Sequence, residues 1–289
     1  MNTIYKFLFS FGFFATLLFS SCELYNPSEP IPAYIHIEKF NLTTDYATQG
    51  SNSHKITDAW VYVDDQLIGC FELPATFPVI TEGTHKVKIV AGIKVNGIAS
   101  NRGQYPFYNP YEQIVNFEVG KKITLSPTVT YKSSTTFAFK EDFEVPGVTI
   151  ETTAFCDTII EELTWPDPVF EGTKSIIGYA DPTRFRFECA TADSFALPHG
   201  GAHVFLEFNY RCNYTTAVSI IARGTTTSSQ FVCLYLNPTY NNWNKAYIYL
   251  TPNVSGTFTA LDYKMVWGFH NTIPLDSAAL MLDNIKLVY

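Results

Sequence analysis

Short runs in which apolar and polar residues alternate recur along almost the whole chain after residue 33. Tyr34–Phe40 alternates in this way, and His85–Val90 places Val87 and Ile89 on one face with two lysines on the other. Successive side chains of a strand point to opposite faces, so this period of two is typical of strands with one buried face. Aromatic residues make up 16% of the chain, and runs of helix-forming residues are few. The sequence therefore predicts an all-β protein.

Turn residues divide the first half of the chain into a series of hairpins. Asn96-Gly97, flanked by apolar residues, is the strongest hairpin signal, because both residues tolerate positive φ. Asp64-Asp65 marks a second turn. Further strands are expected at Asp58–Val63, Gln66–Gly69, Ile114–Val119 and Ile123–Tyr131. About seven short strands in roughly 100 residues predict a first β-sandwich of the Ig-like kind over residues 34–131.

A polar break at Lys132–Thr136 separates this unit from a second one, which is expected over residues 139–289. Its strands are predicted at Arg184–Cys189, His203–Tyr210, Ala217–Arg223, Gln230–Leu236, Lys245–Leu250, Tyr263–Phe269 and Ala279–Val288. The chain is long enough for two domains of the usual size, about 150 residues each. We therefore expect a second β-sandwich, of the jelly-roll kind.

The first 33 residues have a different character. Lys6 precedes an apolar run without charge, Phe7–Phe19, and Ser20-Ser21-Cys22 follows. This order matches the n-region, h-region and cleavage point of a signal peptide. The run is shorter than the about 20 apolar residues that span a bilayer. We expect a signal peptide at residues 1–21 and a proline-rich extended tether at residues 22–33.

Phe19-Ser20-Ser21-Cys22 resembles the relaxed lipobox of lipoproteins from Bacteroidota-type Gram-negative bacteria. The resemblance implies that the Cys22 thiol is acylated and becomes the first mature residue. Several acyl chains on one cysteine form a lasting membrane anchor, whereas a single chain binds only marginally. The expected location is the outer membrane, with the periplasmic and the surface-exposed orientations both open.

The segments Trp60–Gly69, Leu73-Pro74 and Glu82–Val87 resemble the PEGA family of small Ig-like surface repeats. The chain departs from the family at Asp65, where these repeats usually have glycine. The resemblance implies a fold and no shared catalytic site, because a fold does not by itself define a function.

The second unit opens on Asp142-Phe143-Glu144 and closes on Leu282-Asp283-Asn284-Ile285. These motifs resemble the jelly-roll sandwiches of MAM-type and carbohydrate-binding modules. The resemblance implies that the first and last strands of the unit lie side by side.

Carboxylates at both ends of the second unit suggest a structural calcium ion. If the first and last strands are adjacent, Glu141, Glu144 and Asp283 would offer the hard oxygen ligands that Ca²⁺ prefers. A solvated acidic edge is the alternative. We expect no cofactor other than this ion.

Two groups of aromatic residues are candidate binding surfaces. Tyr105, Phe107, Tyr108 and Tyr111 occupy one apolar loop, and exposed aromatic patches usually mark partner sites. In the second unit, the aromatic rings of a further group could stack on sugar rings. These glycan-binding candidates are Trp165, Tyr240 and Trp243. The alternative for each group is an aromatic side chain packed beneath its own loop.

Charge and motifs narrow the functional classes. The net charge of −8 disfavours nucleic acid as a partner, because a nucleic-acid binder must neutralise phosphates. The sequence contains no nucleophile elbow, Walker loop or His-Glu-x-x-His motif, so we expect no enzyme. A glycosidase would need two carboxyl groups in one cleft, and neighbours such as Glu161-Glu162 do not establish one.

Together these features predict a non-enzymatic outer-membrane lipoprotein with two β-sandwiches. Its expected partners are the membrane lipid, through acylated Cys22, and an envelope protein, so that it acts as an interaction or accessory subunit of an envelope complex. The alternative is a carbohydrate-binding lipoprotein, and a glycosidase is the third hypothesis.

Overall fold

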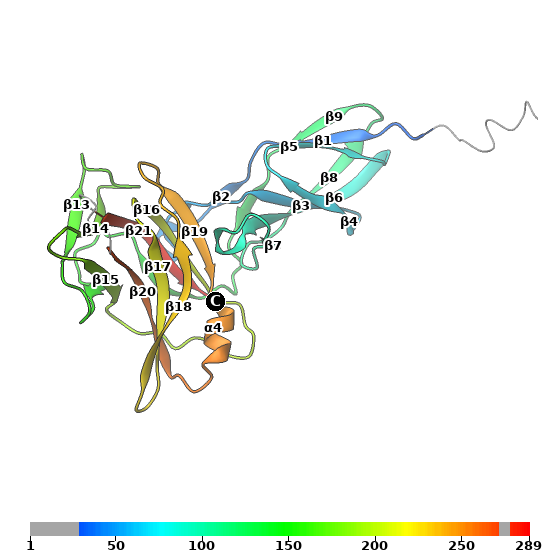
Figure 1. Ribbon diagram of the computed structural model, residues 1–289. Helices are drawn as coiled ribbons and strands as arrows, with labels where there is room; N and C mark the ends of the chain where they lie inside the picture. The colour runs from blue at the N-terminus through cyan, green and yellow to red at the C-terminus, as the bar shows by residue number, and fades with distance from the viewer. Residues whose placement is uncertain (1–28, 272–277) are drawn as a thin grey trace, which may run out of the picture.

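The computed structural model describes residues 29–271 and 278–289 and consists of two bodies of β-strands (Figure 1). The predicted all-β fold is confirmed. Cys22, the predicted signal peptide and most of the predicted tether lie outside the described residues. Within the described ranges, no helix has both the length and the apolar character needed to cross a membrane.

The first body is built from ten strands in three sheets. One sheet has the order β5-β1-β9, the second pairs β10 with β2, and the third has the order β4-β3-β6-β7 with β8 also on β6. The strands are β1 (Ala33–Ile37), β2 (Asn41–Thr43), β3 (Asp58–Val63), β4 (Gln66–Glu72), β5 (Ala75–Val79), β6 (Gly83–Lys94), β7 (Arg102–Gln104), β8 (Tyr111–Phe117), β9 (Lys122–Leu125) and β10 (Thr128–Thr130). We call this body the first sandwich.

Both turns expected in the first sandwich are present. Asp64 and Asp65 have φ of 47° and 63°, so both adopt the left-handed conformation that glycine adopts most readily. The Asp64 carboxylate accepts a hydrogen bond from the Lys86 amide at 3.0 Å, which ties the turn to β6. Asn96 and Gly97 also have positive φ, but they lie in the short 3-10 helix Val95–Gly97, so the connection from β6 to β7 is longer than a two-residue turn.

The second body is built from eleven strands in two sheets. One sheet has the order β13-β14-β21-β16-β19, with β11 also on β21, and we call it the inner sheet. The other has the order β12-β15-β20-β17-β18, and we call it the outer sheet. The strands are β11 (Phe137–Glu141), β12 (Ile150–Thr152), β13 (Ile160–Thr164), β14 (Lys174–Ala180), β15 (Arg186–Thr191), β16 (Phe205–Cys212), β17 (Thr216–Arg223), β18 (Ser228–Leu236), β19 (Asn244–Tyr249), β20 (Asp262–His270) and β21 (Ala278–Val288).

The core of this second sandwich lies between its two sheets. Phe187 and Trp267 from the outer sheet and Phe208 and Leu287 from the inner sheet are almost fully buried there. β11 pairs antiparallel with β21, with Glu141 opposite Ile285, so the first and last strands lie side by side as expected. Within residues 29–271 and 278–289, the α-helices are two short ones, α3 (Tyr46–Gln49) and α4 (Thr251–Gly256).

The first sandwich packs against the outward face of the inner sheet, beside β16 and β19 (Figure 1). Residues of these strands alternate between the two sides: Leu206 and Phe208 enter the core, whereas Phe205 joins the hydrophobic cluster of the first sandwich. The Tyr105 ring contacts the rings of Phe205 and Tyr247 edge-on, at centroid distances of 5.2 and 5.0 Å. The two sandwiches therefore share an apolar interface.

This interface corrects the prediction of an aromatic partner surface. Tyr105, Phe107 and Tyr108 are 1%, 7% and 2% exposed, and Tyr111 is partly buried on β8 with its hydroxyl donating to Gln113. The apolar loop is covered because the inner sheet of the same chain packs on it. The envelope-complex hypothesis thereby loses the surface that motivated it.

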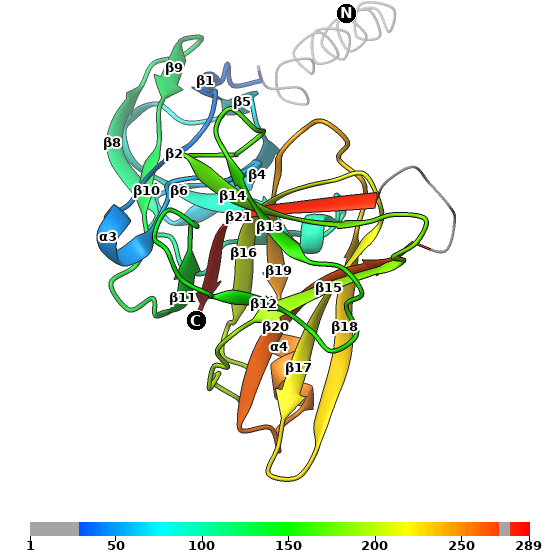
Figure 2. The ribbon, with the colours of Figure 1, turned by 90° about the vertical axis from the view of Figure 1, so that its left-hand side faces the viewer.

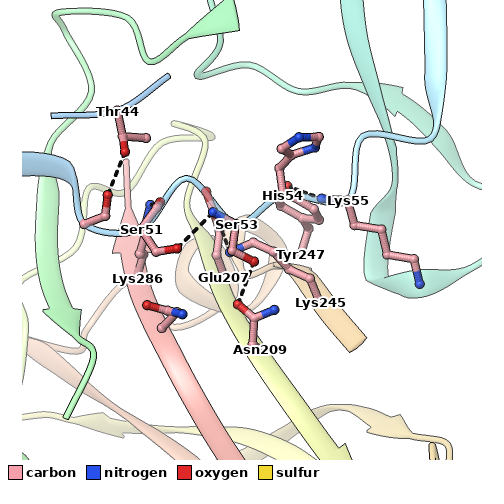
Figure 3. A network of polar contacts seen from close by, with 12 residues as sticks. Thr44, Ser51, Ser53, His54, Lys55, Glu207, Asn209, Lys245, Tyr247 and Lys286 are labelled. Carbon is pink, nitrogen blue, oxygen red and sulfur yellow. Dashed lines mark hydrogen bonds and ion pairs between the residues drawn. The ribbon is translucent and has the colours of Figure 1, made fainter. Parts of the chain in front are cut away.

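A buried polar network lies at the centre of the interface (Figure 3). The Glu207 carboxylate is fully buried, accepts hydrogen bonds from the hydroxyls of Tyr105 and Tyr131, and forms an ion pair with the Lys245 ammonium at 3.2 Å. Burial raises the pKa of Glu207, but the charges of Lys245 and Lys286 and the two hydrogen bonds outweigh it, so the net shift is downward. The carboxylate is therefore ionised at neutral pH.

Candidate functional site: a groove on the outer sheet

The outward face of the outer sheet carries a groove with a volume of about 440 Å³. One row of residues crosses four strands, with Glu188 opposite Gly268, Gly268 opposite Ala217, and Ala217 opposite Tyr235. Side chains of one row stand on the same face of a sheet. The two smallest residues of the row occupy the central strands and the two largest lie at the margins, so the row forms the floor and walls of a groove.

Gly268 keeps the floor low for a steric reason. A Cβ atom at this position would lie 2.7 Å from the Phe187 carbonyl oxygen and 3.1 Å from the Cα of Glu188. Both neighbours are on β15, so any larger residue would push this strand away. The glycine thus allows the outer sheet to remain closely packed beneath the groove.

The polar walls of the groove are held in place by hydrogen bonds. Glu188 accepts from the Thr153 hydroxyl at 2.7 Å and from the Gln230 side-chain amide at 3.1 Å. Gln230 is on β18 and Glu188 is on β15, so this last bond passes over β20 and β17. Gln230 lies opposite Ile221 and not opposite Ala217, so the bond runs diagonally across the outward face of these strands.

The margins of the groove combine aromatic and cationic groups. Tyr235 is 64% exposed and lies on the edge strand β18. At the end next to β15, Arg186 lies opposite His270 and its guanidinium stacks over the Phe155 ring at 4.9 Å. A flat ring, several hydrogen-bonding groups and an open groove together suit an elongated polar ligand.

The two sheets of the second sandwich differ in what covers their outward faces. The inner sheet is covered by the first sandwich at β16, β19 and β21. The outer sheet turns its outward face away from the first sandwich, and β12, β15, β20, β17 and β18 face the viewer in Figure 2. The groove therefore lies on the face that remains open to a ligand.

The predicted glycan-binding aromatics lie elsewhere on the second sandwich. Trp165 is in the β13–β14 loop and Tyr240 is in the β18–β19 loop, and they are 70% and 69% exposed. Trp243 is partly buried, with its ring 5.6 Å from that of Phe170, so the two loops meet there. None of the three predicted residues lines the groove, and their role in binding stays a prediction.

The predicted calcium ligands point to separate partners. Glu141 accepts from the Phe143 amide at 2.5 Å, Glu144 from the Thr173 hydroxyl at 2.6 Å, and Asp283 from the Ser175 hydroxyl at 2.6 Å. In the part of the chain that the structure describes, no group of three or more His, Cys, Asp or Glu side chains could hold a metal ion. Although β11 and β21 are adjacent as expected, the arrangement of these side chains does not support the calcium site.

The groove residues were predicted to lie in strands, but nothing in the sequence marked them as a site. Glu188, Ala217, Tyr235 and Gly268 all fall within predicted strands. The available signal was the small or polar character of the outward positions of these strands. These positions can be recognised as one groove only when the strand order β15-β20-β17-β18 is known.

Comparison with known proteins finds distant structural similarity only. No protein-family model matches the chain, and no curated protein matches it. The CBM22-1 and GH10 modules of an endo-1,4-β-D-xylanase from Clostridium thermocellum, complexed with xylohexaose, align with a TM-score of 0.40 and 11% identity over 53% of this chain and 28% of the xylanase chain. This chain thus spans little more than a quarter of that chain's length.

Two further solved structures are carbohydrate-binding modules. One, described as a module of the β-sandwich superfamily with promiscuous specificity, aligns with a TM-score of 0.39 and 12% identity over 80% of this chain and 84% of its own. The family 11 module from Clostridium thermocellum, in complex with a β-1,3-1,4-mixed-linked tetrasaccharide, has a TM-score of 0.36 and 11% identity over 51% of this chain and 92% of its own. Similarities this distant do not transfer a ligand to this chain.

Proposed function

We propose that this protein is a non-catalytic glycan-binding protein and that the groove of the outer sheet holds the glycan. The observation that carries the proposal is the row Glu188, Gly268, Ala217 and Tyr235, in which a low apolar floor lies between a carboxylate and an exposed aromatic ring. This combination fits the two surfaces of a sugar, its CH face and its hydroxyl edge.

The chemistry of the groove favours sugars over an apolar ligand. Tyr235 offers a flat ring to the CH face of a pyranose, a contact that combines apolar burial with a polar hydroxyl at the ring's edge. Glu188 and Gln230 already hold each other, so their remaining hydrogen-bonding capacity is oriented before the ligand arrives. Preorganised groups lose less side-chain entropy on binding, which suits a ligand that offers many hydroxyls.

Replacing Tyr235 with alanine is expected to weaken glycan binding about tenfold or more. Loss of one buried aromatic contact costs about 1.5–3 kcal/mol, and each 1.4 kcal/mol changes affinity tenfold. A glycan array with the wild-type protein identifies the ligand, and isothermal titration calorimetry with that ligand measures the effect.

Tyr240→Ala is the matched control, because Tyr240 is exposed to a similar degree on the same sandwich but lies outside the groove. Retention of affinity in Tyr240→Ala and loss in Tyr235→Ala supports the groove. The opposite result would move the site to the predicted platform of Trp165, Tyr240 and Trp243. An array without any bound glycan would reject the proposed function.

We also propose, from the sequence, that acylated Cys22 anchors the protein in the outer membrane. The apolar run Phe7–Phe19 and the lipobox-like Phe19–Cys22 support this location. Mass spectrometry of the mature protein is expected to find Cys22 at the amino terminus with attached acyl chains. An unmodified amino terminus, or a Cys22→Ser form that stays in the membrane fraction, would contradict the anchor.

A further inference from the structure

A second cavity lies at the junction of the two sandwiches and has a volume of about 210 Å³. Its walls come from both bodies: Lys55, Lys94 and Asn96 from the first sandwich, and Tyr235, Asn244 and Lys245 among others from the second. We call it the junction pocket. Tyr235 lines both this pocket and the groove, so a single ligand could extend over its ring from one to the other.

The charge of the junction pocket contrasts with that of the whole protein. The chain carries a net charge of −8, yet the residues that line the pocket include three lysines and no aspartate or glutamate among the described residues. Lys94 pairs with Glu72 at 2.7 Å and Lys245 with Glu207 at 3.2 Å, and both carboxylates lie outside the lining. The pocket therefore presents positive potential to its interior.

Lys55 provides the positive charge that is least compensated. Its ammonium donates to the Asn244 side-chain oxygen at 2.5 Å, and no carboxylate pairs with it within residues 29–271 and 278–289. Asn244 is itself fixed, because its amide nitrogen donates to the Tyr210 hydroxyl at 3.1 Å. Figure 3 shows the Lys55 side chain directed away from the buried network around Glu207.

The surroundings of Lys55 disfavour its charge. The Lys55 side chain reaches solvent, but partial burial of its ammonium lowers the pKa, and the positive charge of Lys94 lowers it further. An anion bound beside Lys55 would offset both effects, because its opposite charge stabilises the ammonium. Lys55 is paired with a neutral group, Asn244, and lies in the same pocket as Lys94 and Lys245, so an anionic ligand would find uncompensated positive charge there.

We propose that the junction pocket binds the carboxylate of an acidic sugar, while the neighbouring units of the same glycan pass over Tyr235 into the groove. The volume suits one sugar ring, and the tyrosine and asparagine side chains of the lining suit its hydroxyls. The assignment of a sugar acid rests on the proposed glycan function. The attraction of the pocket for a carboxylate rests on its lysines alone.

The test compares trigalacturonate with its fully methyl-esterified form by calorimetry on the full chain. The two trisaccharides share their rings and hydroxyls, and only the first carries carboxylates. Charge-assisted hydrogen bonds contribute about 1.5–3 kcal/mol each, so the acid is expected to bind about 10- to 100-fold more tightly than the ester. Added salt should reduce this preference, because Lys55 is accessible to solvent.

Three variants locate the effect. Lys55→Met is expected to lower the affinity for the acid to that for the ester, whereas Lys55→Arg keeps the charge and most of the preference. Lys122→Met, on the exposed side of β9, is the control and should change neither affinity. Equal binding of acid and ester by the wild type, or an unchanged preference in Lys55→Met, would contradict the proposal that the junction pocket binds a carboxylate.

Gln230→Ala separates the pocket from the groove, because Gln230 lines only the groove. If this variant loses affinity for acid and ester alike while the wild type does not distinguish them, glycan binding in the groove is supported and carboxylate binding in the junction pocket is rejected. If Lys55→Met removes the preference for the acid and Gln230→Ala has no effect, carboxylate binding in the junction pocket is supported and glycan binding in the groove is rejected. Binding of neither trisaccharide would reject both for this ligand class.

Discussion

Glu207→Ala is expected to destabilise the folded chain by about 3–5 kcal/mol, the usual cost of removing one partner from a buried ion pair. Lys245, whose side chain is 2% exposed, would lose the carboxylate that pairs with it at 3.2 Å. The hydroxyl of Tyr131, 2.9 Å from the same carboxylate, would also lose its acceptor in a buried position. Urea unfolding followed by tryptophan fluorescence measures the change.

Glu118→Ala is the matched control, because Glu118 is exposed between β8 and β9. A change within about 0.5 kcal/mol is expected there, as for most surface substitutions. Tyr131→Phe removes one hydroxyl, which donates to the Glu207 carboxylate and accepts from the Lys286 ammonium at 3.5 Å, and should cost about 1–2 kcal/mol. If Glu207→Ala were as stable as Glu118→Ala, the network would not be what holds the two sandwiches together.

Most of the strands were predictable because their signals are local. Alternation in Tyr34–Phe40 and the turn at Asp64-Asp65 depend on residues that are neighbours in sequence, and the structure contains both. β14 was not predicted. The buried Ser175 and the buried Gly178 interrupt the alternation of apolar and polar residues by which a strand is recognised. Gly178 is required because a Cβ there would meet the Phe187 ring, a contact from a distant strand.

The function of the aromatic loop was not predictable from local signals. Tyr105 is apolar enough to mark an interface, and the interface exists, but it lies between two parts of the same chain. The missing information was the partner of its hydroxyl, which is Glu207, 102 residues further along the chain. A charged residue within the predicted strand His203–Tyr210 was the available hint, since a buried carboxylate needs donors.

Asp283→Asn is expected to change how stability depends on pH between about 4 and 7. Burial raises the pKa of the Asp283 carboxyl from 3.8 to about 7, more than its hydrogen bonds from Ser175 and Asn284 lower it. A raised folded-state pKa means that the contribution of this group to stability is complete below pH 3.8 and is lost as the pH rises to 7. The loss is at most about 4 kcal/mol at 1.36 kcal/mol per pKa unit.

The difference in unfolding free energy between wild type and Asp283→Asn isolates this group. His54 titrates in the same window with the opposite sign, because burial lowers its pKa from 6.5, but its contribution is common to both proteins and cancels. The variant, which stays neutral, should therefore gain stability relative to wild type as the pH rises from 4 to 7. Urea unfolding at several pH values measures this difference. A constant difference would show that Asp283 keeps its ordinary pKa, and that the carboxylate stays ionised between β14 and β16.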